Sequence, residues 1–302
     1  MSQSRQAITT RPRSGFGQKV LPLASREVTS AFIVRWLIIT IAVIVALVPL
    51  LFLLDNSVKP TIEYFNSPRI LPSRVDWSHF QGLFAPGNTV LRDLTNSLVV
   101  TIVTTICTIV FGSLAAYGLS RLQARRTRLA VVVGLLIIAV RFYPKITIVI
   151  PYFLLMKNLG LLDTVAAIII AHVSITLPLA VLLMMTFYAE IPREIEEAAL
   201  IDGASIVHTY IEVIVPLTTA GMAAAGLLTA FVSWNEFLMA SSVASNNAVT
   251  LPIAIAGYIT DKGTNWGAMS ALSVIITVPM LIVALFAQRY LVRGLTGGAV
   301  KE

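Results

Sequence analysis

Residues 197–216 read EAALIDGASIVHTYIEVIVP, a polar, helix-forming segment that lies between two long hydrophobic ones. Acidic residues and alanines stand near its start, where acids complement a helix dipole and alanine favours the helix. Gly203 tolerates backbone angles that other residues avoid, so we expect it to end a first short helix. A second short helix is expected from Ser205 to about Val213, ending before Pro216. The pattern predicts a compact helix–turn–helix unit that fits a groove on another protein.

The chain as a whole is strongly apolar. Of its 302 residues 57% are hydrophobic and only 12% charged, and the mean hydropathy is +0.85, outside the range of soluble globular domains. Runs of ~20 apolar residues cross a bilayer as helices, whereas a membrane barrel needs short alternating segments. We therefore expect an all-α polytopic membrane protein with six transmembrane helices. The windows are near Trp36–Leu54, Leu98–Leu119, Leu129–Leu155, Thr164–Phe187, Leu217–Met239 and Ala268–Phe286.

The positions of the basic residues predict the orientation. Most of the 22 Lys and Arg residues fall in segments that lie inside when both termini are cytoplasmic, most clearly in the short loop Arg121–Arg128. The net charge of +7 is then explained by topology and anionic lipid, and no nucleic-acid partner is expected. The segment 197–216 would face the cytoplasm. The alternative to a helical unit that docks on a partner is an ordinary amphipathic interfacial loop. The expected organisation is a cytoplasmic tail (1–30), a transmembrane domain (31–290, with the helical loop at about 190–216) and a cytoplasmic tail (291–302).

No motif for catalysis or cofactor binding is present. The chain has no Gly-x4-Gly-Lys-Ser/Thr stretch to hold ATP phosphates. Its three histidines, His79, His172 and His208, lack the spacing of metal ligands, and Cys107 stands alone. We expect no bound cofactor or metal and no catalytic residue. Any step driven by ATP must therefore draw its energy from a partner protein.

The third apolar run is interrupted. As one helix, Leu129–Leu155 would be ~40 Å long, beyond the ~30 Å hydrocarbon core, and Arg141, Tyr143 and Pro144 lie within it. We expect a break near Pro144. Broken backbone and charge at membrane depth are tolerated where they line a cavity, so Arg141 and Tyr143 are candidates for a substrate path. Alternatively, Arg141 marks the outer end of the span and snorkels.

A second polar interruption, at Trp234, Asn235 and Glu236, lies in the fifth expected span. A carboxylate is costly in lipid, so Glu236 should face the interior of the bundle and pair with a cation or be neutral. Aromatic faces with amide and carboxylate groups suit sugar recognition, which makes these three residues substrate-path candidates. A buried Glu236 that braces two helices is an equal alternative, and plain packing is the alternative role for Trp234.

The spacing of the opening segment resembles the coupling-loop signature of the permease subunits of ABC importers, which reads Glu-Ala-Ala, three residues, Gly, nine residues, Ile-x-Leu-Pro. Val213 and Val215 stand where Ile and Leu are usual. The chain also resembles carbohydrate permeases of the maltose type, in particular the second permease of the pair. These carry a Trp-Asn-Glu-Phe stretch and a Gly-rich terminal tail like those of this chain. The residues that match the signature are Glu197, Ala198, Ala199, Gly203 and Pro216.

This resemblance implies an inner-membrane sugar-transport permease that moves a sugar, polyol or glycosyl-glycerol. Its implied partners are a second permease, an ATPase homodimer that carries ATP and Mg, and a periplasmic or lipid-anchored solute-binding protein. The implied contacts with the ATPase are Glu197, Ala198, Ala199, Asp202, Gly203 and Pro216, together with the tail residues Gly294, Leu295, Thr296 and Gly297. The implied contacts with the binding protein are Asn246, Asn247, Thr264 and Asn265.

Three alternatives differ in class. An ABC importer for a non-sugar solute keeps the architecture and changes the cargo. An ion-coupled secondary transporter needs paired ionisable groups at the midplane and internal repeats, of which Glu236 and Arg141 are the only signs. An intramembrane enzyme needs a catalytic constellation deep in the spans, which the sequence does not show.

Overall fold

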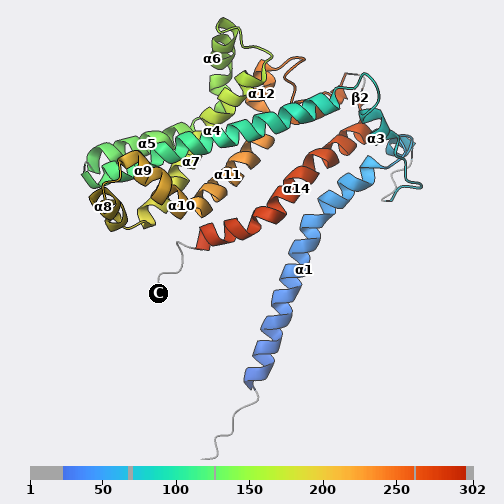
Figure 1. The fold of residues 1–302 in the computed structure, drawn as a ribbon. Helices are drawn as coiled ribbons and strands as arrows, with labels where there is room; N and C mark the ends of the chain where they lie inside the picture. Colours follow the sequence, from blue (N-terminus) through green and yellow to red (C-terminus); the bar gives the residue numbers. More distant parts are fainter. Residues whose placement is uncertain (1–22, 67–70, 126, 262, 297–302) are drawn as a thin grey trace, which may run out of the picture. The chain divides into compact units, whose positions relative to one another are not determined.

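The computed structural model describes residues 23–66, 71–125, 127–261 and 263–296 (Figure 1). The chain divides into two compact units, residues 1–52 and residues 53–302. Of the tail expected at the N-terminus, residues 1–22 lie outside the described residues, and residues 23–30 already belong to the first helix.

The described chain is mostly helical, as expected. A two-residue antiparallel hairpin pairs Ile259 with Thr264. In chain order the elements are α1 (Leu23–Ser57), α2 (Glu63–Asn66), α3 (Ser78–Leu83), α4 (Val90–Arg125), α5 (Thr127–Phe142), α6 (Lys145–Asn158), α7 (Val165–Glu190), α8 (Arg193–Ile201), α9 (Ile206–Thr209), the π-helix η1 (Tyr210–Ile214), α10 (Val215–Leu217), α11 (Thr219–Trp234), α12 (Leu238–Val243), α13 (Leu251–Ala256), β1 (Ile259–Thr260), β2 (Gly263–Thr264) and α14 (Trp266–Thr296).

Four helices in the described chain are long and apolar enough to cross a membrane: α1, α4, α7 and α14. Two further pairs satisfy the same test only if each counts as one bent span, which gives up to six. The first pair, α5 and α6, meets at 90° beside Pro144, so the break expected there is confirmed. The second, Ile206–Leu217 with α11, meets at 77°. The expected continuous fifth span is wrong at its end, because α11 stops at Trp234 and a separate short helix, α12, follows.

The part of α1 in the first unit whose side chains are described, residues 32–52, exposes apolar side chains along its length. Those of Phe32, Trp36 and Val45 are all more than half exposed. Because its backbone polar groups are satisfied inside the helix, such a surface suits lipid or another apolar helix.

In the second unit, α4, α7 and α11 pack together through small residues, as membrane helices do. A Cβ on Gly112 of α4 would lie 3.1 Å from the Cβ of Ala180 on α7, and one on Gly221 of α11 would overlap the ring of Phe187. The Thr108 and Thr176 hydroxyls hydrogen-bond between α4 and α7 at 2.8 Å. Close backbone approach therefore holds these three helices together.

Proline divides the long helices into two kinds. Of the four long helices, α1, α7 and α14 each contain a proline, whereas the 36 residues of α4 contain none. Each internal proline removes a backbone hydrogen bond and favours a bend. The helix α4 is thus the unbroken rod of the second unit.

Candidate functional site

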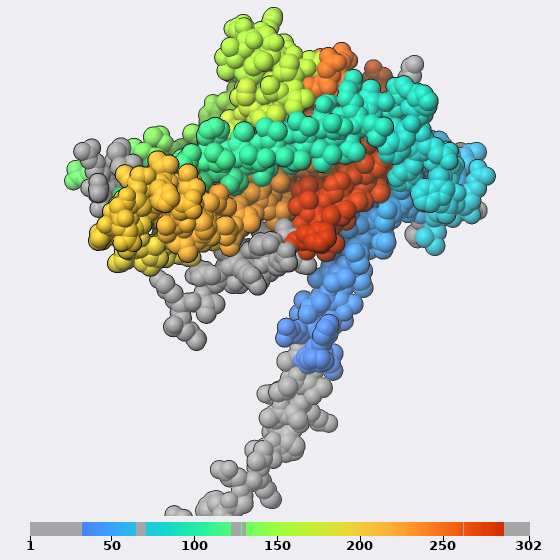
Figure 2. Space-filling model, viewed as in Figure 1, coloured from blue at the N-terminus to red at the C-terminus, as the bar shows by residue number. Residues whose placement is uncertain are grey.

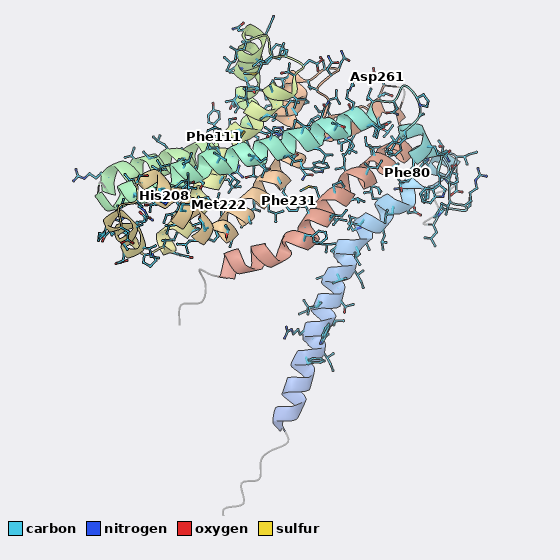
Figure 3. All side chains as sticks on the ribbon, viewed as in Figure 1. Phe80, Phe111, His208, Met222, Phe231 and Asp261 are labelled. Carbon is cyan, nitrogen blue, oxygen red and sulfur yellow. The ribbon has the colours of Figure 1, made fainter. Side chains whose placement is uncertain are left out.

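Residues 193–217 form a unit of short helices that we call the helical knob; it protrudes beside one end of α4 (Figure 2). The first helix, α8, ends at Ile201, and Gly203 turns the chain with a φ of 88°. The Ser205 hydroxyl then caps α9 by accepting a hydrogen bond from the His208 N–H at 3.2 Å. The exposed His208 side chain lies on α9 (Figure 3). The expected helix, glycine turn and second helix are confirmed.

The end of the second helix differs from the expectation. The chain passes from α9 through η1 into α10, which contains Pro216, so the prediction that the helix ends before Pro216 is wrong. Proline disrupts a helix because its ring meets the carbonyl four residues earlier and it has no N–H to donate. The wider π turn directly before α10 changes the spacing of these groups, which is how the helix accommodates the proline.

The knob exposes apolar side chains. Ile201 is 85% exposed, and Ile206 and Val207 are each 66% exposed. Glu197, Ala198, Asp202 and Gly203 are exposed beside them, Ala199 is partly buried, and Pro216 is exposed at the far end of the knob. An apolar patch rimmed by polar groups is typical of a protein–protein contact.

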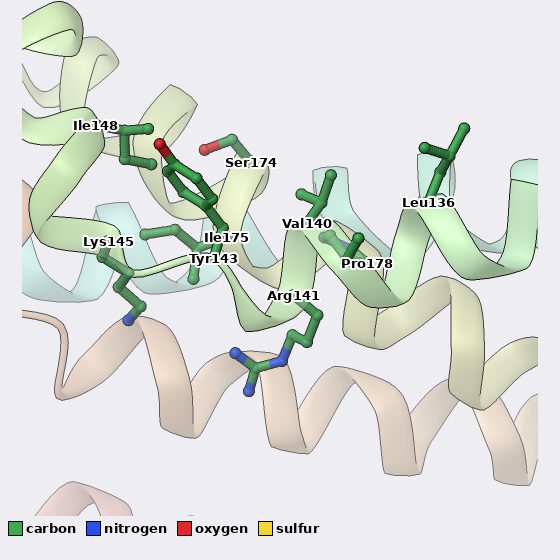
Figure 4. Close-up of a pocket in the computed structure, with 10 residues that line it drawn as sticks. Leu136, Val140, Arg141, Tyr143, Lys145, Ile148, Ser174, Ile175 and Pro178 are labelled. Carbon is green, nitrogen blue, oxygen red and sulfur yellow. The ribbon is translucent and has the colours of Figure 1, made fainter.

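The break at Pro144 opens into a groove of about 450 Å³, lined by residues of α5, α6 and α7 (Figure 4). Arg141, Tyr143 and Lys145 contribute polar groups to its mostly apolar lining. The side chains of Arg141 and Lys145 extend in the same direction from the two sides of the break (Figure 4). The structure thus places two of the predicted path residues, Arg141 and Tyr143, in one groove.

Glu236 is buried, at 5% exposure, and lies next to this groove. Its Oε2 accepts hydrogen bonds from the N–H groups of Met239 at 3.0 Å and Ala240 at 3.2 Å, which caps α12. Its Oε1 is 3.6 Å from the Lys145 Nζ, and its Oε2 is 3.4 Å from the His172 Nε2. The carboxylate therefore pairs with a cation, which was one of its two expected states, and it joins α6, α7 and α12.

Trp234 and Asn235 point elsewhere. The buried Trp234 donates its Nε1–H to the Ile276 carbonyl of α14 at 3.1 Å, and the Asn235 amide donates to the Phe231 carbonyl at 2.9 Å. Both line a separate hollow of about 240 Å³ between α11 and α14. The five predicted path residues are thus divided between two places.

A clamp centred on Asp163 holds the segment that carries two of the predicted contact residues. Asp163 has a φ of 57°, and its carboxylate accepts hydrogen bonds of 3.0–3.1 Å from four successive backbone N–H groups, Ser245 to Ala248. The Asn247 side chain also donates to it, at 3.0 Å, whereas the Asn246 side chain is exposed. On the other flank, the Asn96 amide donates to the carbonyls of residues 247 and 249.

Hydrogen bonding determines the charge state of this clamp. Desolvation raises the pKa of the Asp163 carboxyl, but the backbone N–H groups that bind it outweigh this effect and hold the pKa well below its usual range. Of the other two predicted contact residues, Thr264 lies in β2, and Asn265 caps α14 by accepting from the Ala268 N–H at 3.1 Å. The side chains of Asn247 and Asn265 therefore have internal roles.

Lys145, His172 and Asp163 were not among the predicted site residues. A lysine directly after the interrupting proline was a signal for Lys145, since Glu236 needed a cation. For Asp163 the sequence offers only an aspartate in a short turn, a position that is usually a local cap.

The tail residues Gly294, Leu295 and Thr296 form the last turn of α14, which extends further than expected. Gly297, the fourth predicted tail contact, lies outside the described residues.

The model of the family described as binding-protein-dependent transport system inner membrane component matches residues 108–297. The chain belongs to this family. The matched part of the permease contains the helical knob, the groove and the Asp163 clamp. It is therefore a multi-pass membrane protein of the ABC transporter permease class.

Individual relatives cover almost the whole permease. The trehalose transport system permease protein SugB of Mycobacterium tuberculosis is 35% identical over 265 residues, which is 87% of this chain and 95% of the relative. The sulfoquinovosyl glycerol transport system permease protein SmoH of Agrobacterium fabrum is 34% identical over 269 residues, 88% of this chain and 93% of the relative. A chain of a bacterial ABC transporter involved in the import of alginate has a TM-score of 0.71 at 22% identity, over 88% of this chain and 98% of its own, and shows the same fold.

Proposed function

We propose that this permease forms, with a second permease, the path by which a carbohydrate enters the cell. The cargo would be a sugar, a polyol or a glycosyl-glycerol. The observation that carries the proposal is the identity of about a third, over nearly full length, with permeases of trehalose and sulfoquinovosyl glycerol transport systems.

The proposed topology has six spans and cytoplasmic termini in a bacterial inner membrane. The two bent helix pairs then each count as one span, and the distribution of Lys and Arg supports this orientation. The helical knob would lie in the cytoplasm. Residues 1–30 and 291–302 would be cytoplasmic tails flanking the permease domain.

We propose that the knob docks in a groove of a cytoplasmic ATPase dimer, which alone would bind ATP and Mg. Two short helices joined at Gly203 make a stiff element, and the apolar patch around Ile201 supplies the desolvated contact. The docking residues would be Glu197, Ala198, Ala199, Asp202, Gly203 and Pro216, and the tail residues Gly294, Leu295, Thr296 and Gly297 would contact the same ATPase. The permease itself would catalyse nothing.

The groove at the break is the part of the substrate path that we assign to this subunit. It combines an aromatic ring (Tyr143) with cationic groups (Arg141 and Lys145) beside the buried Glu236. Irregular backbone at membrane depth is expected where it lines a cavity. Trp234 and Asn235 would support the neighbouring helices instead of touching the sugar.

On the opposite side of the membrane, a solute-binding protein would contact the segment around Asn246 and the hairpin at Thr264. The exposed Asn246 side chain supports this role. Asn247 and Asn265 would act there indirectly, by holding the backbone in place.

The decisive experiment is the ATPase activity of the complex, purified with its neighbouring gene products and placed in lipid. It would be measured with a panel of sugars and binding proteins. Stimulation by one sugar-loaded binding protein supports the proposal and names the cargo. Stimulation by a non-sugar solute would change only the proposed cargo. Uptake driven by a proton or sodium gradient, with no ATPase co-purifying, would refute an ATP-driven importer.

A further inference from the structure

A cluster of hydroxyl, aromatic and charged side chains fills the space between the helical knob and the long helices. Its α4 members are spaced four residues apart, so they lie on one face of that helix. They meet one residue from α7 and two from the knob. We call it the tyrosine cluster, and its members are Ser113, Tyr117, Arg121, Tyr188, Glu196 and Tyr210.

The inner half of the tyrosine cluster is a buried hydroxyl junction. The Ser113 hydroxyl hydrogen-bonds to the hydroxyls of Tyr188, at 2.5 Å, and Tyr210, at 2.6 Å. The ring of Tyr117 packs against both tyrosines, with centroids 5.7 Å and 5.1 Å apart. Ser113 and Tyr188 are completely buried. One serine therefore joins α4 to the end of α7 and to the π-helix of the knob.

The outer half is an ion pair that reaches α8. Arg121 pairs with the Glu196 Oε1, and the Tyr117 hydroxyl donates to the Glu196 Oε2 at 3.2 Å. The guanidinium carbon also lies 5.3 Å from the centre of the Tyr117 ring. Only 21% of the Arg121 side chain and 13% of the Glu196 side chain are exposed, so salt screens this pair weakly.

These contacts join segments that are not neighbours in the chain. The knob continues covalently from α7 and into α11, so displacing it pulls on those two helices directly. The helix α4 has no such connection to the knob, yet it packs against both α7 and α11. Side chains must therefore carry any force between the knob and α4.

We propose that the tyrosine cluster is the link that makes α4 move with the helical knob when the ATPase displaces it. This inference rests on the proposed function. The members of the tyrosine cluster are positioning residues, because they lie outside the groove assigned to the sugar and act through the knob and α4. Hydrogen bonds and an ion pair are directional, so a rotation of α8 either carries α4 along or breaks the cluster, and an unbroken cluster moves both as one body.

The test compares variants in the complete complex, reconstituted in liposomes with its ATPase, its binding protein and the sugar that stimulates it. Tyr117→Phe and Glu196→Gln remove cluster contacts with little change in volume. Glu190→Gln is the control, because this exposed carboxylate near the same end of α7 makes no ion pair or hydrogen bond within the described residues. The measured quantity is sugar transported per ATP hydrolysed, which does not depend on the yield of complex.

We expect each cluster variant to lower this ratio at least about fivefold, in the range of ordinary coupling between sites, while the control leaves it unchanged. The double variant should lose little more than either single one, because both substitutions act on contacts of one carboxylate: Tyr117→Phe removes its hydroxyl donor, and Glu196→Gln removes the charge that pairs with Arg121. The charge swap Arg121→Glu with Glu196→Arg should restore part of the ratio, a recovery that simple damage to packing would not give.

Two results would overturn the inference, and they can be told apart. In the first, the unmodified complex couples ATP hydrolysis to sugar uptake, and the cluster variants either keep its ratio of sugar to ATP or lower that ratio additively, with no recovery in the charge swap. The proposed link is then wrong, and the proposed function stands. If the unmodified complex shows no uptake coupled to ATP with any loaded binding protein, the proposed function fails and the link fails with it.

Discussion

Replacing the buried Glu236 should separate its two structural roles. Glutamine keeps an oxygen that can accept from the Met239 and Ala240 N–H groups, but it loses the charge that attracts Lys145 at 3.6 Å. Leucine removes both roles and leaves two buried N–H groups unpaired, each worth about 1–3 kcal/mol. We expect Glu236→Gln to cost about 1 kcal/mol, because the Lys145 side chain is 36% exposed and stays hydrated without its partner. Glu236→Leu should cost about 3–5 kcal/mol, because it also leaves the two N–H groups without an acceptor.

The assay is the apparent Tm of the purified complex in detergent. For a unit of this size each kcal/mol corresponds to roughly 2–4 °C, so the glutamine variant should lose roughly 3 °C and the leucine variant roughly 10 °C. Lys145→Met should cost more than Glu236→Gln, because it leaves the buried carboxylate without its cation, and adding it to Glu236→Gln should cost almost nothing further. Equal losses for glutamine and leucine would refute the capping role, and additive losses for Glu236→Gln and Lys145→Met would refute the pair.

Three further predictions follow from single contacts. Gly112→Ala should lower the apparent Tm by crowding the facing alanine of α7, at about 1–3 kcal/mol, whereas Gly226→Ala, whose added Cβ meets only atoms at 3.6 Å or more, should not; equal losses would argue against close packing at Gly112. Because the pKa of Asp163 is lowered on folding, its stabilisation is complete above the unfolded value of about 4 and is lost as the pH falls towards the folded value. Asp163→Asn should therefore weaken the fall of Tm with acid below about pH 4, and an unchanged pH profile would contradict the clamp. Gly203→Pro and Glu197→Lys should each abolish uptake while membrane insertion, measured by the yield in the membrane fraction, stays intact; normal uptake would exclude the docking role of the knob.

Features controlled by neighbouring residues were predictable from the sequence. The break beside Pro144 and the turn at Gly203 follow from the backbone limits of single residues, and the structure has both. Pro216 shows where such rules end. Proline alone predicted the end of a helix, but the π turn before it is a cooperative property of several residues and lets the helix continue.

Contacts between distant residues were beyond the sequence patterns. The cost of a buried carboxylate required a partner for Glu236, but only the packing of α6 against α12 identifies Lys145, which is 91 positions earlier (236 − 145 = 91). The same limit applies to Asp163, whose hydrogen-bond donors lie more than 80 positions away. Trp234 shows a different limit: it is close to Glu236 in the sequence, but its side chain hydrogen-bonds to α14, whereas the Glu236 carboxylate caps α12.

Because α4 contains no proline, this helix can transmit a displacement from one side of the bilayer to the other. The tyrosine cluster holds it near Arg121, and Asn96 holds the clamped segment near its other end. These positions are about 38 Å apart along the axis, more than the ~30 Å thickness of the hydrocarbon. An unbroken helix transmits displacement in both directions along its axis. If the proposed binding protein presses on the segment at Asn96, it would bias the knob, and thermodynamic reciprocity would then require the proposed ATPase to alter the affinity for the binding protein by the same factor.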